Sequence, residues 1–202
     1  MNIFVLDKDP KTAARLHNDK HVVKMILESA QILSTAHRVL DGRYVTYPKK
    51  TKTGKYRRAK AWTLNGPKHQ ILYKATHSNH PCSLWCRKSS ENYKWLLALT
   101  EALCDEYYHR YGSHKNPPMQ HSVRRSGMLD ILQTLPDNIP EGPLTPFALA
   151  MPDQYKSADS VQSYRDYYVG EKAGIMKYTR RDVPGWVERG VFKKSLKEGQ
   201  KQ

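Results

Sequence analysis

Five polar residues within the stretch 19–40 have the types and spacing of a site for proton transfer. They are separated by 3, 4, 3 and 4 residues, so they share one face of a helix with 3.6 residues per turn. A carboxylate beside a cation, flanked by a histidine and an amide, suits general acid/base chemistry when that face is partly buried. The five residues are His21, Lys24, Glu28, Gln31 and Thr35.

The rest of this stretch is mostly apolar, which makes the polar stripe narrow. A surface helix carries a broad polar face and a core helix carries none, so a narrow stripe indicates the lining of a cleft. The alternative is an ordinary ion pair between Lys24 and Glu28 on a half-exposed face, which contributes about 0.2–0.5 kcal/mol.

The elements that must position the stripe are mainly helical. Asn2–Leu6 is a short apolar run, which we interpret as a strand or an extended arm packed on the core. Asp9 is expected to cap a short helix that begins at Pro10. We expect Asp19 to cap the helix that carries the stripe, and Gly42 to end it.

Further along the chain, apolar periodicity and proline and glycine positions predict shorter helices. The chain is long enough for one domain with a real core, and it shows no repeat and no convincing linker. We therefore expect a mainly α, single-domain fold over 1–202, with the other helices over 67–77, 84–87, 90–111, 127–135 and 158–178.

The charge balance favours a polyanionic partner. Thirty-four Lys and Arg against nineteen Asp and Glu give a net charge of +15. The sequence has no run of about twenty apolar residues, and its first residues lack the basic region of a signal peptide. Three cysteines, an odd number, argue for a reducing compartment. We expect a cytoplasmic protein that acts on nucleic acid and not at a membrane.

The segment 43–62 is interpreted as a basic loop with interleaved aromatic residues and no acid. Lysine and arginine contact phosphates and aromatic rings stack on bases, although a merely solvated, mobile loop is the alternative. The C-terminal residues Arg165, Arg180 and Arg181 support the same interpretation more weakly. The residues of the loop expected to contact nucleic acid are Lys49, Lys50, Lys52, Lys55, Tyr56, Arg57 and Arg58.

Two other segments are expected to lie at the surface. Prolines rule out regular structure in the segment 136–152, and the Lys-rich end over 190–202 is expected to be a flexible tail.

Two groups of histidines and cysteines have the residue types of a metal site but not the spacing. His17 and His21 are four residues apart, but a helix break at Asn18-Asp19 separates them. The group over 77–86 has the ligands of a zinc site, but its spacing matches no standard zinc finger. We expect no metal ion and no cofactor.

The order of these segments resembles that of the phage endonuclease V family, the pyrimidine dimer DNA glycosylases. His21 and Glu28, seven residues apart, fall where that family has its active-site histidine and catalytic glutamate. His80 matches a histidine near the family's DNA-binding face, and Trp186 matches the aromatic ending that approaches DNA. The sequences of three segments, HVVKMILESAQ, NHPCSLW and AMPDQYKS, also resemble those of uncharacterised small phage proteins.

The resemblance implies a small, single-domain α fold and an imine mechanism. In the family the terminal α-amine attacks C1′ of the damaged nucleotide, the base leaves, and the glutamate assists before β-elimination nicks the strand. Asn2 is bulky and should leave Met1 in place, so the implied amine is that of Met1. Leu27 and Gln31 stand where the family has arginines, and Lys24 compensates as a charge or as an amine nucleophile.

These observations predict a monomeric enzyme that acts on a base in duplex DNA, most specifically a DNA glycosylase with or without AP-lyase activity. Three alternatives stay open: a phage DNA base-modifying transferase on the same fold, a non-catalytic nucleic-acid-binding module, and an inhibitor of an acidic host protein. A base in a duplex must leave the stack before chemistry reaches it, so each enzymatic alternative requires aromatic wedges and a polar pocket.

Overall fold

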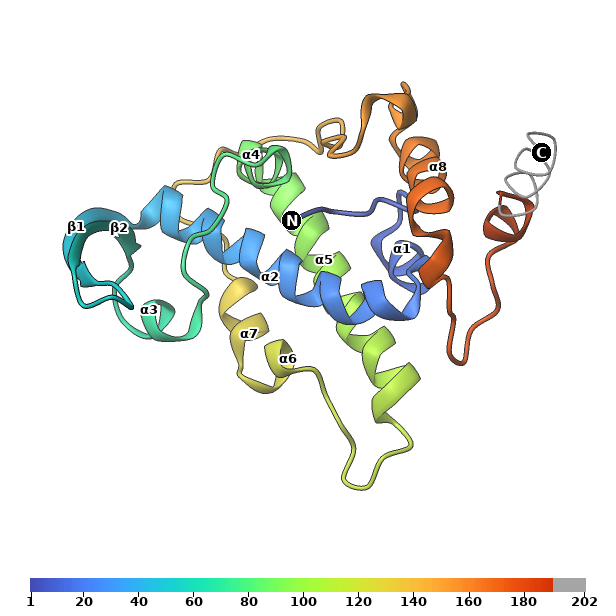
Figure 1. Cartoon of the computed structure of the whole chain (residues 1–202), viewed down its shortest axis with the longest axis horizontal. Coiled ribbons are helices and arrows are strands. Elements are labelled where there is room, and N and C mark those ends of the chain that lie inside the picture. Colours follow the sequence, from blue (N-terminus) through green and yellow to red (C-terminus); the bar gives the residue numbers. More distant parts are fainter. Residues whose placement is uncertain (191–202) are drawn as a thin grey trace.

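Two long helices form the centre of the molecule. The computed structural model describes residues 1–190, and in it α2 (Asp19–Asp41) packs against α5 (Ser90–Tyr107), which continues as one π-helical turn, Tyr108–Gly112 (Figure 1). Both helices are apolar on several faces, and their side chains meet in one core. The prediction of a mainly α fold is confirmed.

The helix ends follow the expected capping chemistry with one difference. Asp9 caps α1 (Pro10–Leu16) by accepting a 2.7 Å hydrogen bond from the Thr12 amide. The cap of α2 is Asn18 and not Asp19, because the Asn18 side chain accepts from the His21 amide at 2.9 Å. Asp19 is instead the first residue of the helix, and its carboxylate accepts from Thr179. The prediction for this cap was therefore wrong by one residue.

The N-terminal arm contains no helix or strand, and Ile3–Leu6 are buried. The N-terminus lies in the middle of the view in Figure 1, with α8 (Ser160–Lys172) on one side of the arm. Tyr164 and Tyr168 of α8 pack their rings on Phe4. The expectation of an extended arm packed on the core is confirmed.

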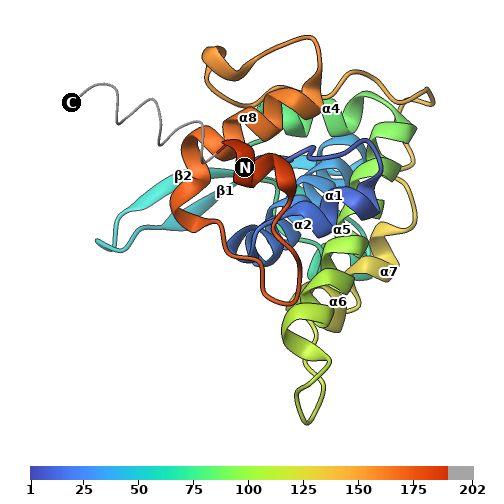
Figure 2. The ribbon, with the colours of Figure 1, turned by 90° about the vertical axis from the view of Figure 1, so that its right-hand side faces the viewer.

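The segment 43–62 is a β-hairpin, so its prediction as a loop was wrong. Strands β1 (Arg43–Lys50) and β2 (Tyr56–Thr63) pair antiparallel, with Tyr47 opposite Ala59. Gly54 has φ +82° in the turn, a conformation that favours glycine. Aromatic and β-branched residues such as Tyr44, Val45, Thr46 and Tyr47 support the strands, whereas the abundance of charge indicated a loop. The hairpin projects away from the helices at one end of the molecule (Figure 2).

The helix predicted over 67–77 is much shorter. It ends at Ile71, because the backbone extends from Leu72 onward and its carbonyls turn toward the Arg38 side chain. The turn predicted over 84–87 is a full helix, and the helices predicted over 127–135 and 158–178 are shorter than expected. The elements observed here are α3 (Pro67–Ile71), α4 (Pro81–Lys88), α6 (Ser122–Arg125), α7 (Met128–Leu132) and α8.

The C-terminal third wraps the helical core. The segment 136–152 has neither helix nor strand, and after α8 the chain becomes helical again over 185–190. The tail predicted over 190–202 lies outside the described residues, apart from Gly190. Within residues 1–190, no helix is both long and apolar enough to cross a membrane.

Candidate active site

Glu28 joins the middle of α2 to the N-terminal arm. Its Oε2 atom accepts a 2.9 Å hydrogen bond from the Asn2 amide and lies 4.0 Å from the amine of Met1. Its other oxygen lies 3.2 Å from Lys24 Nζ. The Glu28 side chain is 13% exposed, whereas that of Lys24 is 63% exposed. The structure therefore brings together a partly buried carboxylate, a terminal amine and a solvent-facing lysine.

The side chain of Asn2 fixes the arm at this place. Its Nδ2 atom donates to the Ala150 carbonyl at 2.9 Å, and its Oδ1 atom accepts from the Tyr164 hydroxyl at 3.0 Å. The Tyr164 hydroxyl is also 2.6 Å from the Ala148 carbonyl. The contact between Asn2 and Tyr164 was not predicted from the sequence, because no local pattern links residues 162 positions apart.

His21 lies inside an aromatic layer. Its ring stacks on Phe4 at 4.4 Å between centroids, and Nδ1 pairs with the Tyr168 hydroxyl at 2.8 Å. Burial, with help from the charges of His17 and Lys24, lowers the pKa of His21 to about 3. The imidazole is therefore neutral at physiological pH. In this geometry it joins α2, the arm and α8, and a role in the reaction stays a prediction.

His80 lies near enough to the N-terminal amine for its charge to act on the imidazole. Its Nδ1 atom caps α4 by accepting from the Cys82 amide at 3.2 Å. Burial and the positive charge of the N-terminal amine lower the pKa of His80. The two remaining members of the stripe differ in burial. Gln31 is half-buried, whereas Thr35 is buried and donates its hydroxyl proton to the Gln31 carbonyl.

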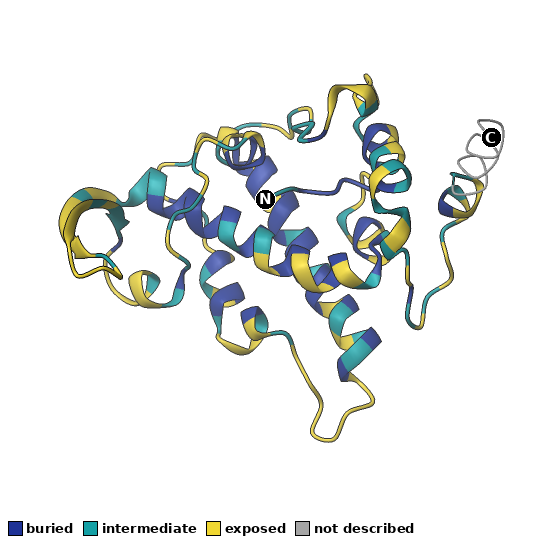
Figure 3. Ribbon diagram, in the orientation of Figure 1, coloured by how far each residue is buried: buried dark blue, intermediate teal, exposed yellow. Residues whose placement is uncertain are grey.

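The solvent face of α2 is broader than the narrow stripe that the sequence indicated. Val23 is 41% exposed and Leu27 39% exposed, next to the exposed cations Lys20 and Lys24. In Figure 3, exposed stretches (yellow) alternate with buried ones (dark blue) along α2. The site thus opens on a mixed apolar and cationic surface.

The predicted nucleic-acid contacts fall into two groups. The seven predicted residues of 49–58 are all exposed on the hairpin. The C-terminal arginines are instead engaged within the protein: Arg165 donates to the Leu6 carbonyl at 2.9 Å, Arg180 to that of His109, and Arg181 pairs with Glu106 at 2.8 Å. The structure does not bring the two groups together.

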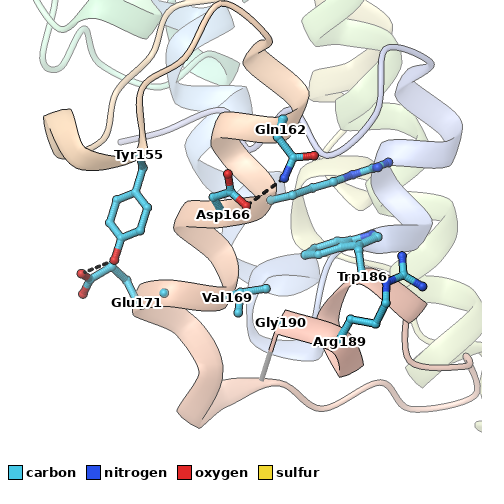
Figure 4. Close-up of a pocket in the computed structure, with 10 residues that line it drawn as sticks. Tyr155, Gln162, Asp166, Val169, Glu171, Trp186, Arg189 and Gly190 are labelled. Atoms are coloured by element: carbon cyan, nitrogen blue, oxygen red, sulfur yellow. Dashed lines mark hydrogen bonds between the residues drawn. The ribbon is translucent and has the colours of Figure 1, made fainter. Parts of the chain in front are cut away.

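Trp186 borders a hollow of about 660 Å³ between α8 and the segment 185–190 (Figure 4). The Arg165 guanidinium lies 5.5 Å from the centre of the Trp186 ring. Two carboxylates line the same hollow: Asp166 accepts from Gln162 at 2.8 Å, and Glu171 accepts from Tyr155 at 2.9 Å. This mixture of charges is less favourable to phosphate than a purely cationic surface is.

A buried ionic cluster fastens the C-terminal segment to the start of α2. Arg110, which is fully buried, pairs with Glu106 at 2.6 Å and with Asp19 at 2.9 Å. Glu106 also pairs with Arg181, and Asp19 accepts from Thr179 at 2.7 Å. The cluster holds the residues that follow α8 against α2 and α5.

Comparison with known proteins adds one finding. The sequence model of a family described as pyrimidine dimer DNA glycosylase matches residues 1–120. The matched range contains the arm, Glu28, the hairpin and α5, whereas α8 and the residues that hold Asn2 lie outside it. Neither the curated proteins nor the solved structures include a match.

Proposed function

The chain belongs to the pyrimidine dimer DNA glycosylase family, and on that premise we propose that it removes a damaged pyrimidine from duplex DNA and nicks the strand at that nucleotide. The observation that carries the proposal is the position of Glu28, whose carboxylate lies 4.0 Å from the Met1 amine. At this distance the carboxylate is close enough to exchange protons with a group bound to the amine.

In the proposed reaction, the uncharged amine of Met1 forms a bond to C1′ as the bond from C1′ to the base breaks. The base leaves with the electron pair and takes up a proton, and the sugar ring opens to give an imine. The imine makes the C2′ hydrogen acidic, so Glu28 removes it and the bond from C3′ to the phosphate breaks. Glu28 is thus the general acid/base, and Met1 supplies the nucleophile.

Lys24 is the rival nucleophile, because its amine is also close to Glu28. We favour Met1 because the Asn2 amide binds Glu28 and so holds the adjacent Met1 amine beside the carboxylate, whereas the Lys24 side chain is 63% exposed. We assign Lys24 the role of a phosphate contact that compensates for the arginines absent at Leu27 and Gln31. His21 and His80 complete the assignment as residues that orient the arm and the DNA.

The hairpin is proposed to contact the duplex away from the damaged nucleotide. Glu28 lies thirteen positions before Asp41, where α2 ends, and the hairpin begins two residues later at Arg43. At 1.5 Å per residue this is about 20 Å, or about six base pairs of 3.4 Å. The exposed lysines and arginines of 49–58 would then neutralise phosphates on the flank of the lesion.

Borohydride trapping tests the proposal, because it reduces an imine between protein and DNA to a stable adduct. On duplex DNA with a pyrimidine dimer or an abasic site, we expect a trapped adduct and a nick. Glu28→Gln keeps the shape of the side chain, and we expect it to slow nicking by about 10²- to 10⁴-fold. Lys24→Gln is the matched control, which should weaken DNA binding and still give the adduct. If neither substrate yields a nick or an adduct, the proposal is wrong.

A further inference from the structure

A second concave site lies between the hairpin and the segment 69–75, and Arg38 in its lining is about 15 Å along α2 from Glu28. The hollow has a volume of about 730 Å³. Its described lining contains six lysine or arginine residues and no Asp or Glu: Arg38, Lys49, Arg57, Arg58, Lys60 and Lys74. A concave surface lined by cations without acids concentrates positive potential and attracts anions.

Arg38 strengthens this potential from the floor of the hollow. The residue is 3% exposed, and its guanidinium donates to the carbonyls of Trp62 at 3.0 Å and Leu72 at 2.8 Å, and also to those of His69 and Tyr73. These partners are dipoles and not charges, so the positive charge of Arg38 is retained. The same bonds join the hairpin to the opposite wall, which means that the hollow is already formed in the absence of ligand.

The strand register shows how the inner face of the hairpin is built. Tyr47 lies opposite Ala59, and Lys49 lies opposite Arg57. Opposite residues of an antiparallel pair point to the same side of the sheet, and all four line the hollow. The small side chain of Ala59 leaves space in front of the Tyr47 ring, and Tyr47 is 38% exposed. The cations Lys49 and Arg57 lie near the strand ends. A free aromatic face next to cations is suited to stacking of a base whose phosphate is held nearby.

We propose that this hollow binds an unpaired nucleotide of single-stranded DNA, with the base against Tyr47 and the phosphates on the surrounding cations. A B-form duplex exposes only base edges in its grooves, so it reaches the outer lysines but cannot place a base face on Tyr47. The size of the hollow and its aromatic wall therefore select one strand. This site is separate from the one at Glu28 and takes no part in the bond-breaking steps proposed there, although its cations Lys49, Arg57 and Arg58 are also proposed duplex contacts.

The test measures binding of undamaged DNA to the full chain, which involves no chemistry. A fluorescent oligothymidine of roughly ten nucleotides spans a site of this kind. Tyr47→Ala removes the stacking surface, and Ala59→Leu fills the space in front of it. We expect each to weaken binding of the single strand by about 5- to 150-fold, the effect of losing one stacked base. Binding of an undamaged duplex should change much less.

Two matched variants on the outer face serve as controls. Tyr44 and Thr46 lie opposite Trp62 and Lys60, on the side away from the alanine pair. Tyr44→Ala and Thr46→Leu make the same chemical changes as the test variants, and we expect single-strand binding as in the parent protein. Thermal unfolding of all four variants checks the fold.

A second measurement needs no substitution. An oligonucleotide that carries photoreactive thiothymidine should crosslink to Tyr47, as located by mass spectrometry. Crosslinks confined to other parts of the protein would overturn the inference. The inference would also be overturned if Tyr47→Ala and Ala59→Leu bound the single strand as tightly as the parent protein does. It would be overturned as well if these variants lost as much affinity for the duplex as for the single strand. Failure of any of these tests leaves the proposed cleavage at Glu28 untouched, because none uses a lesion.

Discussion

Tyr164→Phe tests whether the C-terminal layer positions the amine. The substitution removes one buried hydroxyl, which lies 3.0 Å from Asn2 Oδ1 and 2.6 Å from the Ala148 carbonyl, and it keeps the ring on Phe4. A net hydrogen bond contributes about 0.5–1.5 kcal/mol, and the carbonyl of Ala148 loses a partner as well. We therefore expect a loss of about 1–3 kcal/mol in the free energy of unfolding.

The substitution should also slow the reaction, independently of its effect on the free energy of unfolding. Without the bond from Tyr164, Asn2 is held less firmly, and the Met1 amine next to it moves relative to Glu28. A misplacement of about 1 Å costs up to about 100-fold in rate, so we expect imine formation at saturating DNA to slow by about 10- to 100-fold. Urea unfolding gives the stability, and borohydride trapping under single-turnover conditions gives the rate.

Tyr93→Phe is the matched control. It also removes a buried hydroxyl, which donates to the Leu132 carbonyl at 2.9 Å, on a helix that carries no part of the arm. The two variants should lose similar stability, but only Tyr164→Phe should lose rate. Equal trapping rates in the two variants would refute the idea that Tyr164 positions the amine.

Three further predictions concern charge. The slope of log affinity for duplex DNA against log salt concentration should become about 3 to 4 units less steep when Lys49, Lys50, Arg57 and Arg58 are reversed in charge. Fluorescence anisotropy measures the affinities, and an unchanged slope would exclude these phosphate contacts. Glu106→Gln leaves Arg110 and Arg181 without their shared counter-ion, and urea unfolding should show a loss of about 3–5 kcal/mol. Burial lowers the pKa of His17 from 6.5 to about 4, so between these pH values the unfolded chain binds a proton there that the folded chain does not. The free energy of unfolding should therefore keep its full value above pH 6.5 and fall by up to about 3 kcal/mol toward pH 4. His17→Gln should reduce this fall.

Features that depend on neighbours in sequence could be predicted from the sequence. The cap at Asp9, the extent of α2 and the position of Glu28 on it follow from local spacing. The arm could be anticipated because an apolar run of five residues must be buried somewhere. These features place the residues of the predicted stripe on one helix, α2.

Features that depend on distant contacts could not be predicted. Asn2 meets Tyr164 across 162 residues, and the carbonyls that bind Arg38 come from three separate segments. The hairpin was predicted as a loop because its many cations outweighed the strand propensity of Tyr44, Val45 and Tyr47. His21 has the residue type of a catalytic group, but its burial against Phe4 and α8 emerges only when the chain is folded.

Locating the trapped adduct tests the central claim most directly. The protein is reduced with borohydride on a damaged duplex and digested, and mass spectrometry identifies the residue that carries the sugar remnant. We predict that the remnant lies on the α-amine of Met1, the group that the structure places 4.0 Å from Glu28. A remnant on Lys24 Nζ, or no adduct while the strand is nicked, would contradict the account.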